Sequence, residues 1–302
     1  MSRIVQFPEF GPASVLEVVD IEPPLPAPGK VRVAVRAAGI NPADSKVRRG
    51  VSMGSKPPTL PGRLGREIAG VIETLGEGVT QFAVGDEVFG IVAGIGLADL
   101  VVTNPANLAR RPAGLSWEAA GGLPVVGLTA WDSVASQQLT DADTVLVSAA
   151  AGGVGGLAAQ LAIRAGATVI GTASESNHEH LRALGVIPIT YGPGLAGRVR
   201  AIAPRPVTVV LDHHGPETIE AGLELGVDPA RINTIATDPE VYGVRYVGRG
   251  PINTGTLDTL AALIVAGELE FTVTASYPLA EVVTAFERLD DGHVRGKLVL
   301  TP

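Results

Sequence analysis

The first 110 residues alternate short apolar stretches with turns rich in proline and glycine. Apolar stretches of strand length occupy residues 15–21, 30–38, 67–75 and 86–92. Turn sequences such as Gly76-Glu77-Gly78 separate them, and helical periodicity is weak. Short strands at this spacing are typical of an antiparallel barrel or sandwich. We therefore expect a β-rich domain at the start of the chain.

The pattern changes after Pro112. Ser116 has the position of a helix N-cap, and residues 128–138 are expected to continue as a second helix. From Thr144 onward, apolar strands alternate with helical segments, which predicts a parallel, doubly wound sheet covered on both faces. The expected strands are 144–148, 168–172, 187–190, 207–211, 231–235 and 245–247; the expected helices are 154–165, 178–184, 196–202, 217–225 and 257–266.

The C-terminal segment repeats neither pattern. A strand at 270–275, a helix at 279–289 and a strand at 297–300 are followed by no further unit. We expect this segment to return to the first domain. The fold class is then α/β, with a β-rich domain formed by residues 1–115 and 267–302 and a parallel-sheet domain formed by residues 116–266.

The turn after the expected strand 144–148 is the most informative segment. It reads Ala150-Ala151-Gly152-Gly153-Val154-Gly155 and leads into a helix and a second strand, the setting of a dinucleotide-binding fingerprint. Gly152 lets the backbone approach a pyrophosphate, and Gly155 lets helix and strand pack closely. The fingerprint departs from G-x-G-x-x-G at Ala150. A bound dinucleotide is the favoured interpretation, and a turn without ligand is the alternative.

The end of the second strand favours NADP over NAD. NAD-binding units place an acidic residue there for the ribose hydroxyls, whereas this strand is followed by Ser174. The Ser174 hydroxyl can donate to a 2′-phosphate, and Asn177, His178 and Tyr191 are candidates to complete the pocket. Glu175 argues for NAD if its side chain turns inward, and Ser174 has no lysine or arginine within five positions.

Composition excludes several classes of protein. The 23 basic and 31 acidic residues give a net charge of −8, which argues against a nucleic-acid-binding domain. With no cysteine, the chain has no disulfide, thiolate zinc site or cysteine nucleophile. No apolar run of about 18 residues predicts a membrane span. Since no secretory signal is visible, we expect a cytoplasmic protein.

Several motifs in order resemble one family. The chain reads AGINPADSKVRRG at 38–50, LGREIAGVIETLGEGVTQFAVGDEVFG at 64–90, EAAGGLPVVGLTAW at 118–131, AAAGGVGGLAAQLAIRAGA at 149–167 and HVRGKLVLTP at 293–302. These motifs resemble the zinc-independent, zeta-crystallin-like quinone oxidoreductases of the medium-chain dehydrogenase/reductase superfamily. The resemblance covers nearly the whole chain. It implies a GroES-like catalytic domain, a Rossmann domain and NADPH bound in the cleft.

The resemblance also implies a reaction, the transfer of a hydride to a quinone or to the β-carbon of an α,β-unsaturated carbonyl. It places Asn41 beside the nicotinamide ribose and the substrate, and Thr129 at the nicotinamide end. It assigns the 2′-phosphate to Ser174 and Tyr191. The pyrophosphate is assigned to Gly152, Gly153 and Val154.

No metal is expected. Where zinc-using relatives carry a His-Glu pair, this chain reads Gly65-Arg66-Glu67, and it lacks thiols. Neither the catalytic nor the structural zinc site of such relatives can be built. Hydrogen bonds must then polarise the substrate.

Two further catalytic candidates have ordinary alternatives. Asp44 is a candidate general acid, or a carboxylate that organises its loop through backbone N–H groups. His213 follows an expected strand at the edge where ligands bind, and a protonated His213 is a candidate proton donor; a packing role is the alternative. The Arg48-Arg49 pair is expected to face solvent.

Other functions stay open. A non-catalytic NADPH-binding sensor or structural protein is one alternative, and an enoyl-thioester reductase is another. By resemblance, a homodimer is expected to form through the sheet edge at residues 245–247. The physiological acceptor and the proton donor are not determined by the sequence.

Overall fold

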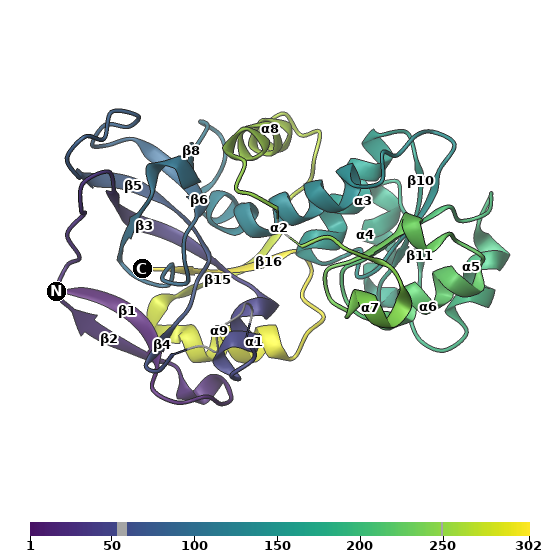
Figure 1. Cartoon of the computed structure of the whole chain (residues 1–302), viewed down its shortest axis with the longest axis horizontal. Helices are drawn as coiled ribbons and strands as arrows, with labels where there is room; N and C mark the ends of the chain where they lie inside the picture. The colour runs from purple at the N-terminus through teal and green to yellow at the C-terminus, as the bar shows by residue number, and fades with distance from the viewer. Residues whose placement is uncertain (53–58, 249) are drawn as a thin grey trace. The chain divides into compact units, whose positions relative to one another are not determined.

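The computed structural model describes residues 1–52, 59–248 and 250–302. It divides into two compact units (Figure 1). The first comprises Met1–Val125, Ile252–Glu268 and Thr272–Pro302, and the second comprises Val126–Pro251 and Leu269–Phe271. The predicted α/β class, with one β-rich and one parallel-sheet unit, is confirmed. In the part of the chain that the structure describes, no helix is long and apolar enough to cross a membrane.

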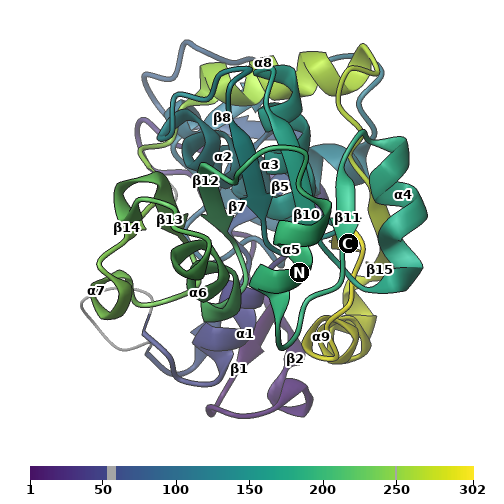
Figure 2. The same ribbon diagram turned by 90° about the vertical axis from the view of Figure 1, so that its right-hand side faces the viewer.

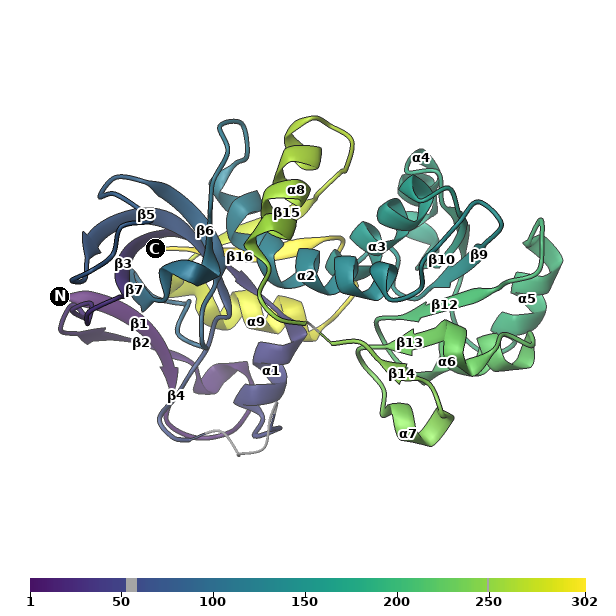
Figure 3. The same cartoon turned by 45° about the horizontal axis from the view of Figure 1, so that its top comes forward.

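The β-rich unit is built on one mostly antiparallel sheet with strand order β15-β16-β3-β5-β6-β8, in which β7 also pairs with β3. The C-terminal strand β16 lies antiparallel to β3, from the start of the chain (Figure 3). The expected return of the tail is therefore confirmed. The strands are β3 (Val31–Ile40), β5 (Glu67–Leu75), β6 (Glu87–Ile91), β7 (Leu100–Thr103), β8 (Leu108–Arg110), β15 (Val273–Pro278) and β16 (Lys297–Thr301).

A smaller sheet and two helices complete the core of this unit. Strand β1 lies between β2 and β4, antiparallel to both. Helix α9 packs against α1, β15 and β16, and its Phe286 side chain is fully buried. The elements are β1 (Ser2–Phe7), β2 (Glu17–Ile21), β4 (Gly62–Arg63), α1 (Pro42–Arg48) and α9 (Val282–Asp290).

The second unit contains a parallel sheet with strand order β11-β10-β9-β12-β13-β14 (Figure 2). All residues of the central strands β9 and β12 are buried, as expected where helices cover both faces. Helix α3 packs on β9 and β10, and α6 packs on β12 and β13. The strands are β9 (Thr144–Val147), β10 (Thr168–Thr172), β11 (Ile187–Ile189), β12 (Val209–Asp212), β13 (Ile232–Thr234) and β14 (Arg245–Tyr246); the helices are α3 (Gly153–Arg164), α4 (His178–Ala183), α5 (Leu195–Ile202), α6 (Pro216–Glu224) and α7 (Pro239–Tyr242).

Helix α2 (Trp117–Ala135) differs from the expectation of two separate helices. It begins where predicted, because the Ala119 N–H donates to the Ser116 hydroxyl at 3.1 Å, and it continues through Pro124. Pro124 lacks an N–H, so the helix loses one donor there without ending. Helix α1 was not expected at all.

The unit boundaries also differ from the expected 115/116 and 266/267. The first half of α2 belongs to the β-rich unit: a Cβ on Gly121 would lie 2.7 Å from the Ala37 carbonyl oxygen, so helix and strand β3 are in close contact. Helix α8 (Thr254–Val265) belongs to the same unit, where it packs against β8. Helical pattern alone does not reveal which sheet a helix covers.

Candidate functional site

The parallel sheet has its switch point between β9 and β12, because the chain builds outward from β9 to β11 and then returns to β12 on the other side. Ligands of open parallel sheets bind outside the carboxyl ends of strands at such a point. Ser148 follows β9 there, and Asp212 is the last residue of β12. The glycine turn lies at this edge.

The turn after β9 has a left-handed residue. Ala149 has φ +48°, a conformation that residues other than glycine rarely adopt. The neighbouring strand holds it: the Ala149 N–H donates to the Thr172 hydroxyl at 3.1 Å, and the Ala150 N–H donates to the Thr172 carbonyl at 2.9 Å. The chain then enters α3, with Gly152 as its N-cap residue. The turn is therefore fixed before any ligand binds.

Two glycines of the turn differ in the space around them. A Cβ on Gly155 would lie 2.3 Å from the Ala149 carbonyl oxygen, so close packing excludes any side chain there. A Cβ on Gly152 would have that oxygen as its nearest described neighbour, at 3.2 Å. Packing within the fold thus demands glycine at 155 far more than at 152. Among the described residues, the Ala149 carbonyl oxygen is the sole atom within 4 Å of the Gly152 Cβ position. This position adjoins the N-terminus of α3, where backbone N–H groups and the positive dipole end suit a phosphate. Gly153 and Val154 are partly exposed there, so this edge fits a dinucleotide pyrophosphate.

Asp212 connects the loops that follow three adjacent strands. Its Oδ1 accepts hydrogen bonds from the Ser148 hydroxyl at 3.0 Å and from the N–H groups of His214 and Gly215. Its Oδ2 accepts from the hydroxyls of Thr234 at 2.6 Å and Thr237 at 3.1 Å. The carboxylate is fully buried. Five donors to one carboxylate fix the carboxyl edge of the sheet as a preorganised surface.

His213 lies at the same edge within a polar network. Its Nε2 is 2.9 Å from the Ser133 hydroxyl, which donates to Asn233 Oδ1 at 3.1 Å. A hydroxyl has one hydrogen, so Ser133 accepts from His213 and the imidazole hydrogen lies on Nε2. Burial lowers the pKa of the His213 imidazole to about 4, against the opposing charge of Asp212. The network and the neutral imidazole favour a packing role for His213, the alternative that the sequence also allowed, over a protonated donor.

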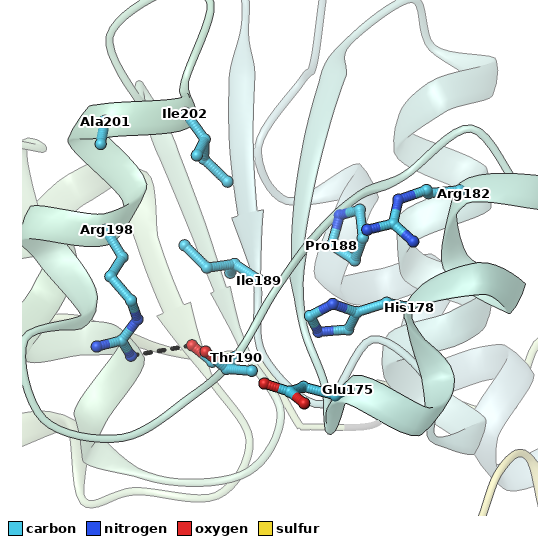
Figure 4. Close-up of a pocket in the computed structure, with 9 residues that line it drawn as sticks. All are labelled: Glu175, His178, Arg182, Pro188, Ile189, Thr190, Arg198, Ala201 and Ile202. Carbon is cyan, nitrogen blue, oxygen red and sulfur yellow. Dashed lines mark hydrogen bonds between the residues drawn. The ribbon is translucent and has the colours of Figure 1, made fainter.

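A surface pocket of about 560 Å³ lies between α4, β11 and α5 (Figure 4). Its lining includes Glu175, which lies between β10 and α4, and His178 and Arg182 from α4. Arg198, from α5, also lines it, and it donates to the Thr190 carbonyl at 3.0 Å. The sequence search around Ser174 missed both arginines. The sequence could have identified Arg182. It follows the candidate His178 by four positions in the expected helix, and residues four apart on a helix lie on the same face.

The expected 2′-phosphate residues adjoin this pocket. Ser174 precedes the lining residue Glu175, and its hydroxyl accepts from Asn177 Nδ2 at 3.0 Å. Tyr191 follows the lining residue Thr190 and is 48% exposed. His178 Nε2 lies 3.3 Å from the Ala173 carbonyl oxygen. The structure thus brings the segments after β10 and β11 together, with cationic side chains beside them.

The remaining expected residues belong to other parts of the chain. Asn41 is in the β-rich unit, where it directly follows β3 and is 4% exposed. Its Oδ1 accepts from Lys297 Nζ at 2.7 Å, and its Nδ2 donates to Glu67 Oε1 at 2.9 Å. Sequence reasoning gave no role to Glu67 or Lys297, although both lie in motifs of the family resemblance. Thr129 is buried in the half of α2 that belongs to the second unit.

The structure favours an organising role for Asp44 over a general acid. Its Oδ2 accepts from the Asn41 N–H at 2.9 Å, and its Oδ1 accepts from the Gly65 N–H at 3.2 Å. Burial raises the pKa of the Asp44 carboxyl, and these two N–H groups oppose the shift. Both oxygens are thus engaged by backbone groups around Asn41.

The expectation that Arg48 and Arg49 face solvent is wrong for Arg48. Its side chain is fully buried, pairs with Asp290 and lies over the Phe286 ring. Arg49 also pairs with Asp290, but its side chain is 51% exposed. The amphipathic helix α9 covers Arg48, a contact that a short charge run does not reveal.

Metal ligands are not gathered anywhere in the described ranges 1–52, 59–248 and 250–302. They contain no group of three or more histidine, aspartate or glutamate side chains placed to hold an ion. Arg66 and Glu67 occupy the stretch where zinc-using relatives carry a His-Glu pair.

Two family models match the chain. The alcohol dehydrogenase GroES-like domain matches residues 27–131, and the zinc-binding dehydrogenase domain matches residues 189–300. Among curated proteins, a quinone oxidoreductase of Pseudomonas aeruginosa is 30% identical, with 100% of each chain covered. Polyketide synthase GfsB of Streptomyces halstedii is 36% identical over 90% of this chain and 5% of its own length. The chain spans 5 to 13% of the length of the first polyketide synthases that it matches.

Solved structures agree over the full length. The Escherichia coli quinone oxidoreductase complexed with NADPH has a TM-score of 0.88 at 27% identity, with 100% of both chains covered. An NAD-dependent alcohol dehydrogenase has a TM-score of 0.88 at 30% identity, with 99% of both chains covered. With these matches, the chain belongs to the quinone oxidoreductases of the medium-chain dehydrogenase/reductase superfamily.

Proposed function

We propose that this oxidoreductase uses NADPH, without zinc, to reduce a quinone or an α,β-unsaturated carbonyl. The observation that carries the proposal is the glycine turn at Gly152, which begins α3 at the switch point of the sheet and where a Cβ would have one described atom within 4 Å. A dinucleotide pyrophosphate fits this position, with the N–H groups of Gly153 and Val154 as donors.

The pocket beside Ser174 supports NADPH over NADH. His178, Arg182 and Arg198 line it, and a 2′-phosphate pairs well with guanidinium groups. Glu175 also lines the pocket and is exposed, so its carboxylate can point away from the phosphate into solvent. We assign the 2′-phosphate to Ser174, His178, Tyr191 and Arg182.

NADPH, when bound, supplies two electrons and one hydrogen as a hydride, and a proton from solvent completes the reduction of a quinone to a hydroquinone. The chain binds and orients the reactants. The α3 N-terminus holds the pyrophosphate, and we assign Thr129 to the nicotinamide end. Asn41 donates its free amide N–H to the ribose or to the substrate carbonyl, where it stabilises developing negative charge.

Gly152→Asp tests the cofactor site. A carboxylate there would repel phosphate, so NADPH affinity should fall at least a hundredfold, while the melting temperature should change little because a Cβ at Gly152 has one described neighbour, at 3.2 Å. NADPH fluorescence titration measures the affinity, and calorimetry measures the melting temperature. Normal NADPH binding by a folded Gly152→Asp variant would show that the assigned site is wrong.

Enoyl-thioester reduction is the second candidate function. It is favoured by two likenesses: the 36% identity to a segment of a polyketide synthase, and the TM-score of 0.88 at 26% identity with the CurK enoyl reductase. The two candidates differ in the acceptor: a higher kcat/KM for crotonyl thioesters than for 1,4-benzoquinone and a conjugated enal would establish the second. Tight NADPH binding with no turnover of any acceptor would instead support a sensor or structural protein.

We also propose a homodimer formed through strand β14. It is the edge strand of the parallel sheet, and its Tyr246 is 56% exposed. Unpaired edge strands readily pair with a second copy. Sedimentation equilibrium of wild type and Tyr246→Pro tests this proposal, and a monomeric wild type would refute it.

A further inference from the structure

Three residues far apart in the sequence meet in the β-rich unit. Lys297 begins β16, Glu67 begins β5, and Asn41 follows β3, which lies between those two strands. Lys297 Nζ donates to Glu67 Oε1 at 2.9 Å, to Asn41 Oδ1 at 2.7 Å and to the Ile40 carbonyl at 2.8 Å. The side chains of Lys297 and Glu67 are 4% and 0% exposed. All three ammonium hydrogens are thus used within the protein.

The fold makes room for the Glu67 carboxylate. A Cβ on Gly39 would lie 2.2 Å from Glu67 Oε1, so only glycine fits beside it. The other oxygen, Oε2, accepts from the Val125 N–H at 2.6 Å, in the turn of α2 that Pro124 interrupts. Glu67 is therefore held from both sides while Oε1 faces Lys297 and Asn41.

This geometry determines the orientation of the Asn41 amide. The amide oxygen faces an ammonium and the amide nitrogen faces a carboxylate. Rotation by 180° would place the amide N–H groups against the ammonium and the amide oxygen against the carboxylate, so both hydrogen bonds would be lost. In the part of the chain that the structure describes, the second N–H of this amide has no partner, which leaves it for a ligand. Burying an ion pair adds little net stability, because desolvation offsets the attraction. The pair is therefore better explained by the orientation that it imposes than by stability.

We propose that Lys297 and Glu67 are positioning residues that hold the Asn41 amide in its donor orientation. The inference rests on the proposed function, in which Asn41 serves the reaction. Neither residue contacts the substrate in this proposal; both act through Asn41.

A double-mutant cycle tests it. Lys297→Met, Asn41→Ala and the double variant are compared by kcat/KM with NADPH and 1,4-benzoquinone. Misplacing a reacting group by about 1 Å can cost roughly a hundredfold in rate, so each single variant should lose at least about tenfold. If Lys297 acts through Asn41, the double variant should be no slower than Asn41→Ala, within about twofold. Losses that multiply would overturn the proposal.

Two controls separate positioning from stability. Lys297→Arg keeps the charge and should recover part of the activity that Lys297→Met loses, although its planar guanidinium cannot reproduce all three hydrogen bonds of the ammonium. Arg231→Met removes the Arg231–Asp143 ion pair of the second unit, so it should lower the melting temperature without changing kcat/KM. If Lys297→Met fails to fold, Glu67→Gln replaces it in the same cycle, because glutamine keeps the shape and removes the charge.

A second readout does not depend on turnover. The Asn41 side-chain amide resonances, assigned by their loss in Asn41→Ala, should exchange with D2O at least tenfold faster in Lys297→Met and Glu67→Gln than in wild type. Unchanged exchange in both variants would refute the positioning role. An inactive wild type with this exchange pattern would refute only the proposed function.

Discussion

The imidazole of His213 shows how its surroundings alter one residue. Its Nε2–H is donated to Ser133, and burial lowers its pKa to about 4. A free histidine has a pKa near 6.5. Between these two values the unfolded chain binds a proton that the folded chain does not. Stability should therefore fall as the pH drops from about 6.5 to about 4.

This linkage predicts the pH dependence of unfolding. At 1.36 kcal/mol per pKa unit, the wild type should lose about 3 kcal/mol through His213 between pH 7 and pH 4. His213→Asn cannot take up this proton, so its stability should decline less steeply over the same range. Urea unfolding at several pH values measures the difference. Parallel curves for the two proteins would mean that His213 titrates normally.

Arg182 tests cofactor selectivity. Its exposed guanidinium lines the pocket next to Ser174. Arg182→Ala should therefore weaken NADPH binding about tenfold, since a charge-assisted hydrogen bond contributes about 1.5 kcal/mol. NADH binding should not change, because NADH has no 2′-phosphate. Arg110→Ala, at a 58% exposed arginine on β8 of the β-rich unit, removes the same charge elsewhere and is the matched control. Equal weakening of both cofactors would contradict the assignment.

At the scale of elements, strand β9 and helix α3 are held close by Gly155. A Cβ there would lie 2.3 Å from a backbone oxygen, and the backbone cannot move away as a flexible side chain can. Overpacking typically costs about 1–3 kcal/mol. Gly155→Ala should therefore lower the free energy of unfolding by about 1–3 kcal/mol or more. Gly152→Ala, with its 3.2 Å contact, should cost less. Chemical denaturation compares them, and equal losses would refute the distinction.

Local patterns predicted most elements within a few residues. Strands β5 and β10 match the expected ranges, and α3, α4 and α6 begin within one residue of theirs. The predicted helices were wrong in two places, where packing or element length outweighed the local sequence signal. Pro124 does not end α2, because proline removes a single donor and both halves of the helix pack on their own units. Helix α1 was missed because its seven residues are too few to show a helical period of hydrophobic positions.

At the scale of the whole molecule, the chain should not need a metal. It has no cysteine, and histidine or carboxylate ligands do not gather in the described residues. Activity should therefore be unchanged after dialysis against a chelator, whereas a zinc alcohol dehydrogenase treated in parallel should lose its activity. Loss of quinone reduction that added Zn²⁺ restores would contradict this prediction.

The sequence by itself determined the two-part α/β architecture and the glycine turn. These features depend on residues close together in the chain, where periodicity and turn chemistry act. Only the tertiary structure decided that Lys297 and Glu67 hold Asn41, that Arg182 and Arg198 share a pocket, and that Arg48 is buried. The physical reason is that burial, hydrogen bonding and charge pairing join residues up to 257 positions apart, and no local pattern encodes such contacts.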